Sequence, residues 1–285
     1  MKNILIPTDF SPNSWNAVVY AMQFLKDENC KFYFLHTYTP SFYRLDYMIG
    51  GPEFSAIPDY EVDVSVEGLE KTVQDVKKQF PNKKHSYKTV SAFNTLTDEI
   101  NAFSKRKNID MVVMGTQGAT GAEQLFLGSS TVFVIRKAKV PVLAVPKNCR
   151  FTGVKNMLFP TDYWPQYKKE EVQTIIDLAI MHKAEITLLH INDGYDLTEE
   201  QVANRSVLED ELQRVPHNEI EMIGKSMPDA ILEYIDEHHI DLLTMMNRGH
   251  SFFDRILIKQ NIDQIGFHVH IPFLVVRDTA EIKKK

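Results

Sequence analysis

The chain contains two copies of one module. The segment Lys2–Phe10, KNILIPTDF, returns as Lys155–Tyr163, KNMLFPTDY, at an offset of 153 residues. Further along, Ile109–Met114 aligns with Ile240–Met245 at a smaller offset of 131. The two copies therefore account for nearly all of the 285 residues, and the second copy is shorter in its middle.

Each copy alternates short apolar runs with amphipathic stretches, which is typical of βαβ units around a parallel sheet. The apolar runs predict strands at Ile4–Pro7, Lys31–His36, Ser86–Ala92, Met111–Gly115 and Val140–Pro146, and again at Asn156–Pro160, Glu185–Ile191, Glu219–Ile223, Leu242–Met246 and Ile271–Val276. Because the runs are apolar throughout, we expect every strand to be covered on both faces. We predict an α/β protein with two tandem Rossmann-like, doubly wound domains, residues 1–148 and 154–280. Each domain is a five-stranded parallel sheet flanked by helices.

Composition narrows the class of protein. The net charge of −6 and the absence of a large block of Lys and Arg argue against a general nucleic-acid binder. No apolar run approaches the roughly 18 residues of a membrane span, and the first residues do not resemble a signal peptide. We therefore expect a cytoplasmic protein without membrane contact. Cys30 and Cys149 lie far apart without a CxxC pattern, so we expect buried thiols rather than a disulfide or zinc site.

A glycine-rich segment follows the fourth predicted strand of the first copy. That strand runs into Gly115–Gly121, GTQGATG, and Gly128–Thr131, GSST, opens a helix. Glycines let the main chain approach an anion, and a helix N-terminus adds free N–H groups and hydroxyls. Spaced glycines also occur in ordinary loops with a serine cap, so the spacing alone leaves both interpretations open.

With Pro7-Thr8-Asp9 and the Val140-Pro141-Val142 strand, this spacing resembles the ATP-binding branch of the universal stress protein family. The resemblance covers both copies and implies a tandem member that binds ATP or another adenine nucleotide, with or without Mg²⁺. It places Asp9 near the ribose or adenine, Thr37 at the adenine edge and Gly128–Thr131 on the phosphates. The full set of binding residues that it implies is Pro7, Thr8, Asp9, Thr37, Met114, Gly115, Gln117, Gly118, Gly128, Ser129, Ser130 and Thr131.

The second copy departs from this motif. Met246 stands where the first copy has Gly115, Lys259 replaces Gly128, and Gln260 replaces Ser129. Side chains of this size would fill the space that the main chain must leave open, so we predict one nucleotide per chain. Asp162 would then be a capping or structural residue.

Three functions are open at this point. The leading one is a regulatory or stress-response protein in which nucleotide occupancy alters the surface offered to a partner protein. A slow ATP hydrolase or nucleotidyl-transfer enzyme is the second. It is disfavoured because the chain has neither a GxxxxGK[ST] loop nor an evident base with cationic clamps. Glu123 could orient a water, but we expect it to be a solvated carboxylate in a loop. The third is a nucleotide-free dimerising scaffold.

Four smaller predictions complete the sequence analysis. The family resemblance implies that Val140–Pro146 and Ile271–Val276 pair within the chain as a pseudo-twofold dimer, while a homodimer of the whole chain stays open. The aromatic insertion 38–62 is either a lid or partner surface, or packing over the domain edge. His36 and His190 recur at equivalent positions, which favours a role in the fold such as an interstrand hydrogen bond. His268 and His270 lack an evident third metal ligand.

Overall fold

The computed structural model describes residues 1–38, 60–116, 128–164, 166–192, 194–224, 226–247 and 270–277. Several predictions fall outside these residues, namely those on most of the insertion 38–62 and on Gln117, Gly118, Glu123, Lys259, Gln260 and His268. No helix of the described ranges combines the length and the apolar character needed to cross a membrane.

Both halves have the same order of elements up to their fourth strand, and the residues between β9 and β10 lie outside the described ranges. The first half contains β1 (Lys2–Pro7), α1 (Pro12–Phe24), β2 (Cys30–Tyr38), α2 (Tyr60–Gln79), β3 (His85–Phe93), α3 (Leu96–Lys107), β4 (Met111–Gly115), α4 (Ser129–Lys137) and β5 (Val142–Val145). The second half contains β6 (Asn156–Thr161), α5 (Lys169–His182), β7 (Glu185–Asn192), α6 (Glu199–Leu212), β8 (His217–Ile223), α7 (Met227–Glu237), β9 (Leu242–Asn247) and β10 (Phe273–Arg277). The predicted fold class is confirmed, with every predicted strand present.

The two sheets join into one. The strand order is β3-β2-β1-β4-β5-β10-β9-β6-β7-β8, parallel within each half and antiparallel where β5 meets β10. Leu143 faces Leu274, which is its own equivalent in the repeat, and Val142 faces Val275. The local twofold axis therefore passes between Leu143 and Leu274. The predicted pairing of the two last strands is confirmed.

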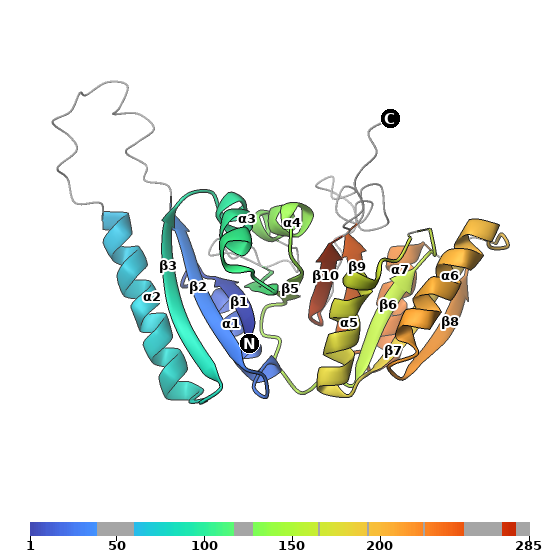
Figure 1. Cartoon of the computed structure of the whole chain (residues 1–285), viewed down its shortest axis with the longest axis horizontal. Helices are drawn as coiled ribbons and strands as arrows, with labels where there is room; N and C mark the ends of the chain where they lie inside the picture. The colour runs from blue at the N-terminus through green and yellow to red at the C-terminus, as the bar shows by residue number, and fades with distance from the viewer. Residues whose placement is uncertain are drawn as a thin grey trace, which may run out of the picture.

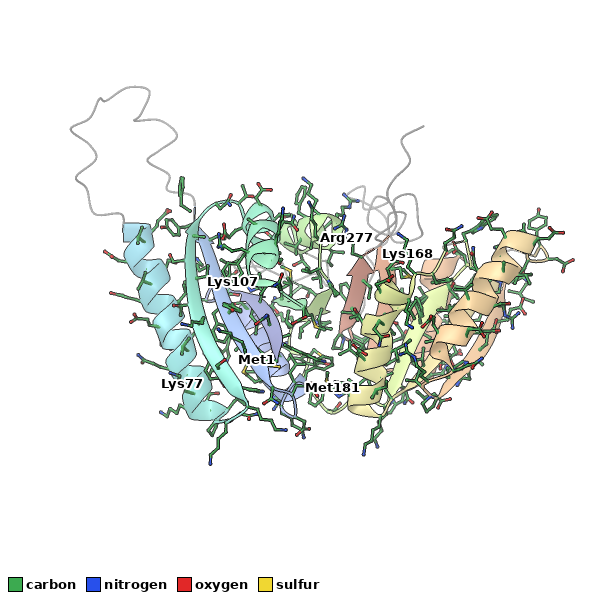
Figure 2. All side chains as sticks on the ribbon, in the orientation of Figure 1. Met1, Lys77, Lys107, Lys168, Met181 and Arg277 are labelled. Atoms are coloured by element: carbon green, nitrogen blue, oxygen red, sulfur yellow. The ribbon has the colours of Figure 1, made fainter. Side chains whose placement is uncertain are left out.

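Helices cover both faces of the joined sheet (Figure 1). One core packs β-strand side chains such as Phe34 and Phe159 against α1, α2, α5 and α6. The other packs Leu5 and Leu158 against α3, α4 and α7. Leu143 and Leu274 belong to the first core, whereas their neighbours in β5 and β10 belong to the second, so both cores continue across the junction. Figure 2 shows side chains filling the space between the strands and both helical layers.

The expectation that every strand is covered on both faces is wrong for β3 and β8. These strands form the two ends of the ten-stranded sheet, and neither contains a fully buried residue. Their sequences alternate polar and apolar residues, as in the EIEMI end of β8. Their apolar side chains are at most partly buried, with Tyr87 of β3 against one core and Val90 and Ala92 against the other, so the helices cover these edge strands in part.

The linker between the halves is fixed by aromatic contacts. The ring of His182, the last residue of α5, lies 4.5 Å from the ring of Phe24 in α1 and 5.9 Å from that of Phe151 in the linker. Its Nε2 is buried without a hydrogen-bond partner in the part of the chain that the structure describes. Burial therefore lowers the pKa of His182; Lys2 and Lys26 lower it further, while Asp27 and Glu28 oppose the shift.

We predict that the Leu143–Leu274 pair stabilises the whole chain. Both side chains are fully buried, so Leu143→Ala or Leu274→Ala should lower the free energy of unfolding by about 2–5 kcal/mol each, by lost burial and cavity formation. Urea denaturation measures this loss. Because the two residues touch, the double variant should depart from additivity. Val207→Ala, at an exposed position on α6, should change stability by less than about 0.5 kcal/mol.

We also predict that His182 makes the fold sensitive to acid. The folded protein holds this imidazole neutral, whereas the unfolded chain protonates it near the ordinary pKa of 6.5. Unfolding therefore takes up a proton, and the free energy of unfolding should fall as the pH drops below about 6.5 and through the lower folded pKa. His182→Phe keeps the ring contact and should make this fall shallower in urea titrations from pH 7.5 to 4.5. Equal slopes for parent and variant would contradict the assignment.

Candidate functional site

The candidate site lies where the strand order reverses in the first half. From β1 the chain passes to β2 on one side, while β4 leads to β5 on the other, and β1 pairs directly with β4. Crevices at the carboxyl ends of two such strands are where open α/β sheets bind ligands. Asp9 follows β1 at this edge, and Gly115 ends β4.

The turn after β1 is held by its own side chains. The Phe10 N–H donates to Thr8 Oγ1 at 3.0 Å, and the Ser11 N–H donates to Asp9 Oδ1 at 3.0 Å. Thr8 Oγ1 also contacts Ser14 Oγ at 3.1 Å, which ties the turn to α1. Phe10 adopts a left-handed φ of 61°, so these bonds hold a conformation that a non-glycine residue rarely takes.

Asp9 is exposed and carries a negative charge at neutral pH. Partial burial raises its pKa, but hydrogen bonds from Ser11 and Ser14 lower it by more, and the pKa lies below its ordinary value. An ionised carboxylate only accepts hydrogen bonds. At this edge Asp9 therefore suits a hydroxyl or amino donor of a ligand and not a phosphate.

Gly115 is required by a close approach between β4 and α1. A Cβ built at this residue would lie 2.6 Å from Asn13 Nδ2 and 3.1 Å from the Asn13 carbonyl oxygen. On the other side, Thr131 Oγ1 donates to the Gly115 carbonyl at 2.9 Å, and the Gly128 N–H donates to the Thr116 carbonyl at 2.6 Å. These two bonds hold α4 against the end of β4.

The first turn of α4 offers N–H and hydroxyl donors. Gly128 is the N-cap, and no side chain of the described residues caps the helix. Ser129 and Ser130 are exposed, whereas Thr131 is only 2% exposed with its hydroxyl on Gly115. An exposed helix N-terminus with flanking hydroxyls favours an anion. Ser129 and Ser130 are thus better placed than Thr131 for the contact predicted for all three.

The remaining predicted binding residues differ in how far they are buried. Pro7, Thr8 and Met114 are buried, and Met114 belongs to the core on the α4 face. Thr37 is half-buried near the end of β2, where it is paired with Ala92 of β3. β1 separates β2 from β4, so Thr37 lies on the far side of Asp9 from Gly115.

The recurring histidines differ between the copies. His190 Nδ1 lies 3.2 Å from the Thr161 carbonyl oxygen, an interstrand contact that confirms the predicted role in the fold. His36 stacks on Phe10 at 4.6 Å, but its Nδ1 is buried without a partner among the described residues. Burial lowers the pKa of His36, opposed by Asp9 and Glu61, so the ring is neutral near pH 7.

The second copy keeps the turn but fills its surroundings. The Tyr163 N–H donates to Thr161 Oγ1 and the Trp164 N–H to Asp162 Oδ1, as in the first copy, which supports a structural role for Asp162. Tyr167, at the position of Ser14, is buried and hydrogen-bonds Thr161 Oγ1. Met246, at the position of Gly115, packs against the core on the α5 face.

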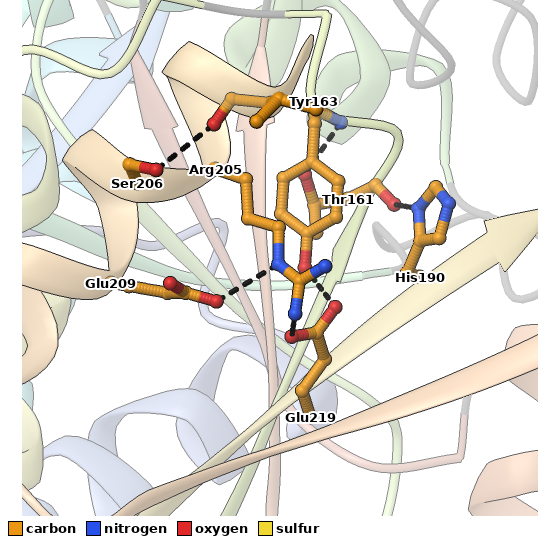
Figure 3. A network of polar contacts seen from close by, with 8 residues as sticks. Thr161, Tyr163, His190, Arg205, Ser206, Glu209 and Glu219 are labelled. Carbon is orange, nitrogen blue, oxygen red and sulfur yellow. Dashed lines mark hydrogen bonds and ion pairs between the residues drawn. The ribbon is translucent and has the colours of Figure 1, made fainter. Parts of the chain in front are cut away.

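A polar network in the second copy joins the turn after β6 to α6 and β8 (Figure 3). The Tyr163 hydroxyl donates to Glu219 at 2.8 Å, and Arg205 of α6 donates to Glu219 at 2.5 Å and to Glu209 at 2.9 Å. The Arg205 guanidinium also lies over the Tyr163 ring, 5.9 Å from its centre. Phe10 is the equivalent of Tyr163 and has no hydroxyl, so it packs over Gly68 instead.

Sequence reasoning missed Asn13, Ser14, Tyr167 and Arg205. The offset of 153 aligns Ser14 with Tyr167, so comparison of the two copies beyond the TD pair would have found this replacement. The contacts of Asn13 and Arg205 join residues distant in sequence and leave no signal in one chain. Within the described ranges, no three His, Cys, Asp or Glu side chains gather in a way that could hold a metal ion.

Fold and site together define a doubly wound α/β protein whose two halves share the turn after their first strand and differ in the residues packed around it. The profile of the universal stress protein family matches this chain twice, over residues 1–146 and 153–277. The chain belongs to the universal stress protein family.

Individual relatives agree with this assignment. Universal stress protein MJ0531 of Methanocaldococcus jannaschii is 32% identical over 149 residues, which are 51% of this chain and 82% of that protein. Universal stress protein Slr1230 of Synechocystis is 27% identical over 173 residues, 60% of this chain and 58% of its own. The crystal structure of a universal stress protein from Archaeoglobus fulgidus shares the tandem fold, with a TM-score of 0.69, 18% identity and 96% of each chain covered.

We predict that Gly115 is held to glycine by Asn13. The Cβ of Gly115→Ala would overlap the Asn13 side chain, so the variant should lose about 1–3 kcal/mol of stability in urea denaturation. Asn13→Ala removes the amide that the methyl group meets, and the double variant should recover part of that loss. If the stability losses of Gly115→Ala and Asn13→Ala simply add in the double variant, the contact with Asn13 is not the reason that residue 115 must be glycine.

Proposed function

We propose that the first half binds one adenine nucleotide, ATP by preference, in the crevice between β1 and β4. We propose further that occupancy serves a regulatory role in a stress response. The proposal rests on two features that occur together where the strand order reverses. One is the exposed carboxylate of Asp9 after β1, and the other is the exposed N-terminus of α4 at Ser129 and Ser130. Membership in the universal stress protein family supports the same assignment.

The two ends of the crevice suit the two ends of a nucleotide. Asp9 accepts hydrogen bonds, as ribose hydroxyls or an adenine amino group require. The amides and hydroxyls at the start of α4 donate hydrogen bonds, as phosphates require. The segment Gly115–Thr131 contains no Lys or Arg, so Mg²⁺ would supply positive charge to a bound triphosphate. The same lack of cations argues against rapid hydrolysis, which needs charge stabilisation at the transferred phosphoryl group.

The second half takes no nucleotide in this proposal. Met246 and Tyr167 occupy the positions of Gly115 and Ser14, and both pack into the core on the α5 face. The chain then has one nucleotide site, and the role of its second half is to pair with the first.

Asp9 and Asp162 provide a matched pair for testing the site. Each accepts a hydrogen bond from the N–H two residues further on, so Asp9→Ala and Asp162→Ala disturb the same turn. Titration calorimetry with ATP and Mg²⁺ should give about one site per chain. Asp9→Ala should weaken binding about tenfold or more, through loss of charged hydrogen bonds, and Asp162→Ala should leave it unchanged.

Other results would reject parts of this function. Two sites per chain, or equal losses from both variants, would place nucleotide in the second half as well. Absence of binding would favour a nucleotide-free scaffold. Metal-dependent ADP release that Asp9→Ala abolishes would favour the slow hydrolase.

A further inference from the structure

A groove outside the nucleotide crevice runs between α1 and the linker that joins the halves. It has a volume of about 420 Å³, within the range of small-molecule sites. One wall is a stripe of α1 with helical spacing, and the other is the start of the linker. The lining residues are Pro12, Trp15, Asn16, Val19, Tyr20, Gln23, Asn148, Cys149, Arg150 and Phe151.

The groove lies on a different side of α1 from the crevice. Asn13 and Ser14 are the residues of α1 that contact Gly115 and Thr8 at the crevice, and both are buried. Trp15, Asn16 and Val19 are half-buried and line the groove. The groove therefore does not belong to the nucleotide site.

Its lining includes a phenol, that of Tyr20. Tyr20 is 2% exposed, and its hydroxyl has no hydrogen-bond partner within the described residues. Burial raises the pKa of this phenol, with Cys149 and Asp241 adding to the shift, so it stays protonated and able to donate. The hydroxyl is not among the fully buried atoms that lack a partner, so the groove leaves it accessible to the oxygen of a ligand.

The rim adds a free positive charge. Arg150 is exposed and forms no ion pair with any acidic residue of the described ranges. The thiol of Cys149 adds no negative charge, because burial raises its pKa to about 11. A guanidinium and a phenol in one groove suit a carboxylate, which accepts from both.

Aromatic rings supply the rest of the surface. The ring of Phe151 meets that of Tyr20 edge to face at 5.5 Å, and Trp15 lies one helical turn before Val19 on the opposite wall. Rings of this kind stack on planar aromatic ligands. We propose that the groove between α1 and the linker binds a small planar aromatic carboxylate, with its ring against Trp15 and Phe151 and its oxygens on Tyr20 and Arg150.

The probe that tests the groove is 2-naphthoate, and its neutral isostere 2-naphthamide is the matched control. The chain has two tryptophans, so the indole N–H region of a ¹H–¹⁵N spectrum holds two signals, and Trp164→Phe assigns them. 2-Naphthoate should shift the Trp15 signal saturably and leave that of Trp164, on the second half, unmoved. 2-Naphthamide should bind about tenfold more weakly, because it lacks the charge.

Two variants separate loss of the Arg150 charge from a general effect on folding. Arg150→Met keeps the apolar stem at an exposed position and should weaken 2-naphthoate about tenfold, whereas Lys147→Met, at an exposed linker position outside the groove, should not. Tyr20→Phe removes only the hydroxyl and should also weaken binding. The proposal is overturned if the Trp15 signal does not shift, if the acid and amide bind alike, or if Lys147→Met weakens binding as much as Arg150→Met. None of these outcomes depends on nucleotide binding.

Discussion

The antiparallel pairing of β5 with β10 is the contact on which the rest of the structure depends. Each half taken alone would end in an open strand edge with unpaired backbone groups, which invites uncontrolled association. Pairing satisfies both edges at once and places Leu143 against Leu274, its own counterpart. Both hydrophobic cores then run through the junction without interruption. Because the two halves share one chain, each is present at a high effective concentration near the other. The second half can therefore pair with the first whether or not it keeps a ligand site of its own.

The two copies share the turn after their first strand but differ in the residues around it. The Thr-Asp turn is built in the same way in both, so Asp9 alone says little about binding. What differs is the material around the turn. Tyr167 hydrogen-bonds Thr161, whose counterpart Thr8 contacts Ser14 in the first copy. Glu219 accepts hydrogen bonds from Tyr163 and Arg205. The second copy thus surrounds its turn with a buried tyrosine and a charged hydrogen-bond network.

Helix α1 connects the features of the first half. Its start contacts the crevice through Asn13 and Ser14, its outer side lines the groove beside the linker, and its last residue, Phe24, packs on His182 of the second half. The candidate site, the groove and the junction between the halves thus meet on a single helix.

The sequence by itself determined the fold, and it placed Asp9 and Gly115 at the ends of their strands. Repeated apolar runs fix strands because their period and length do not depend on distant residues, and the repeated KN-strand-PTD segment fixes equivalent positions in both copies. Only the tertiary structure decided that β3 and β8 are edges, that Thr131 turns to Gly115, and that Asn13 imposes a glycine on β4. The partners of His36 and His190 likewise differ although the residues are the same. Such contacts join residues far apart in the chain, and their energies depend on distances of a few ångströms that no local pattern encodes.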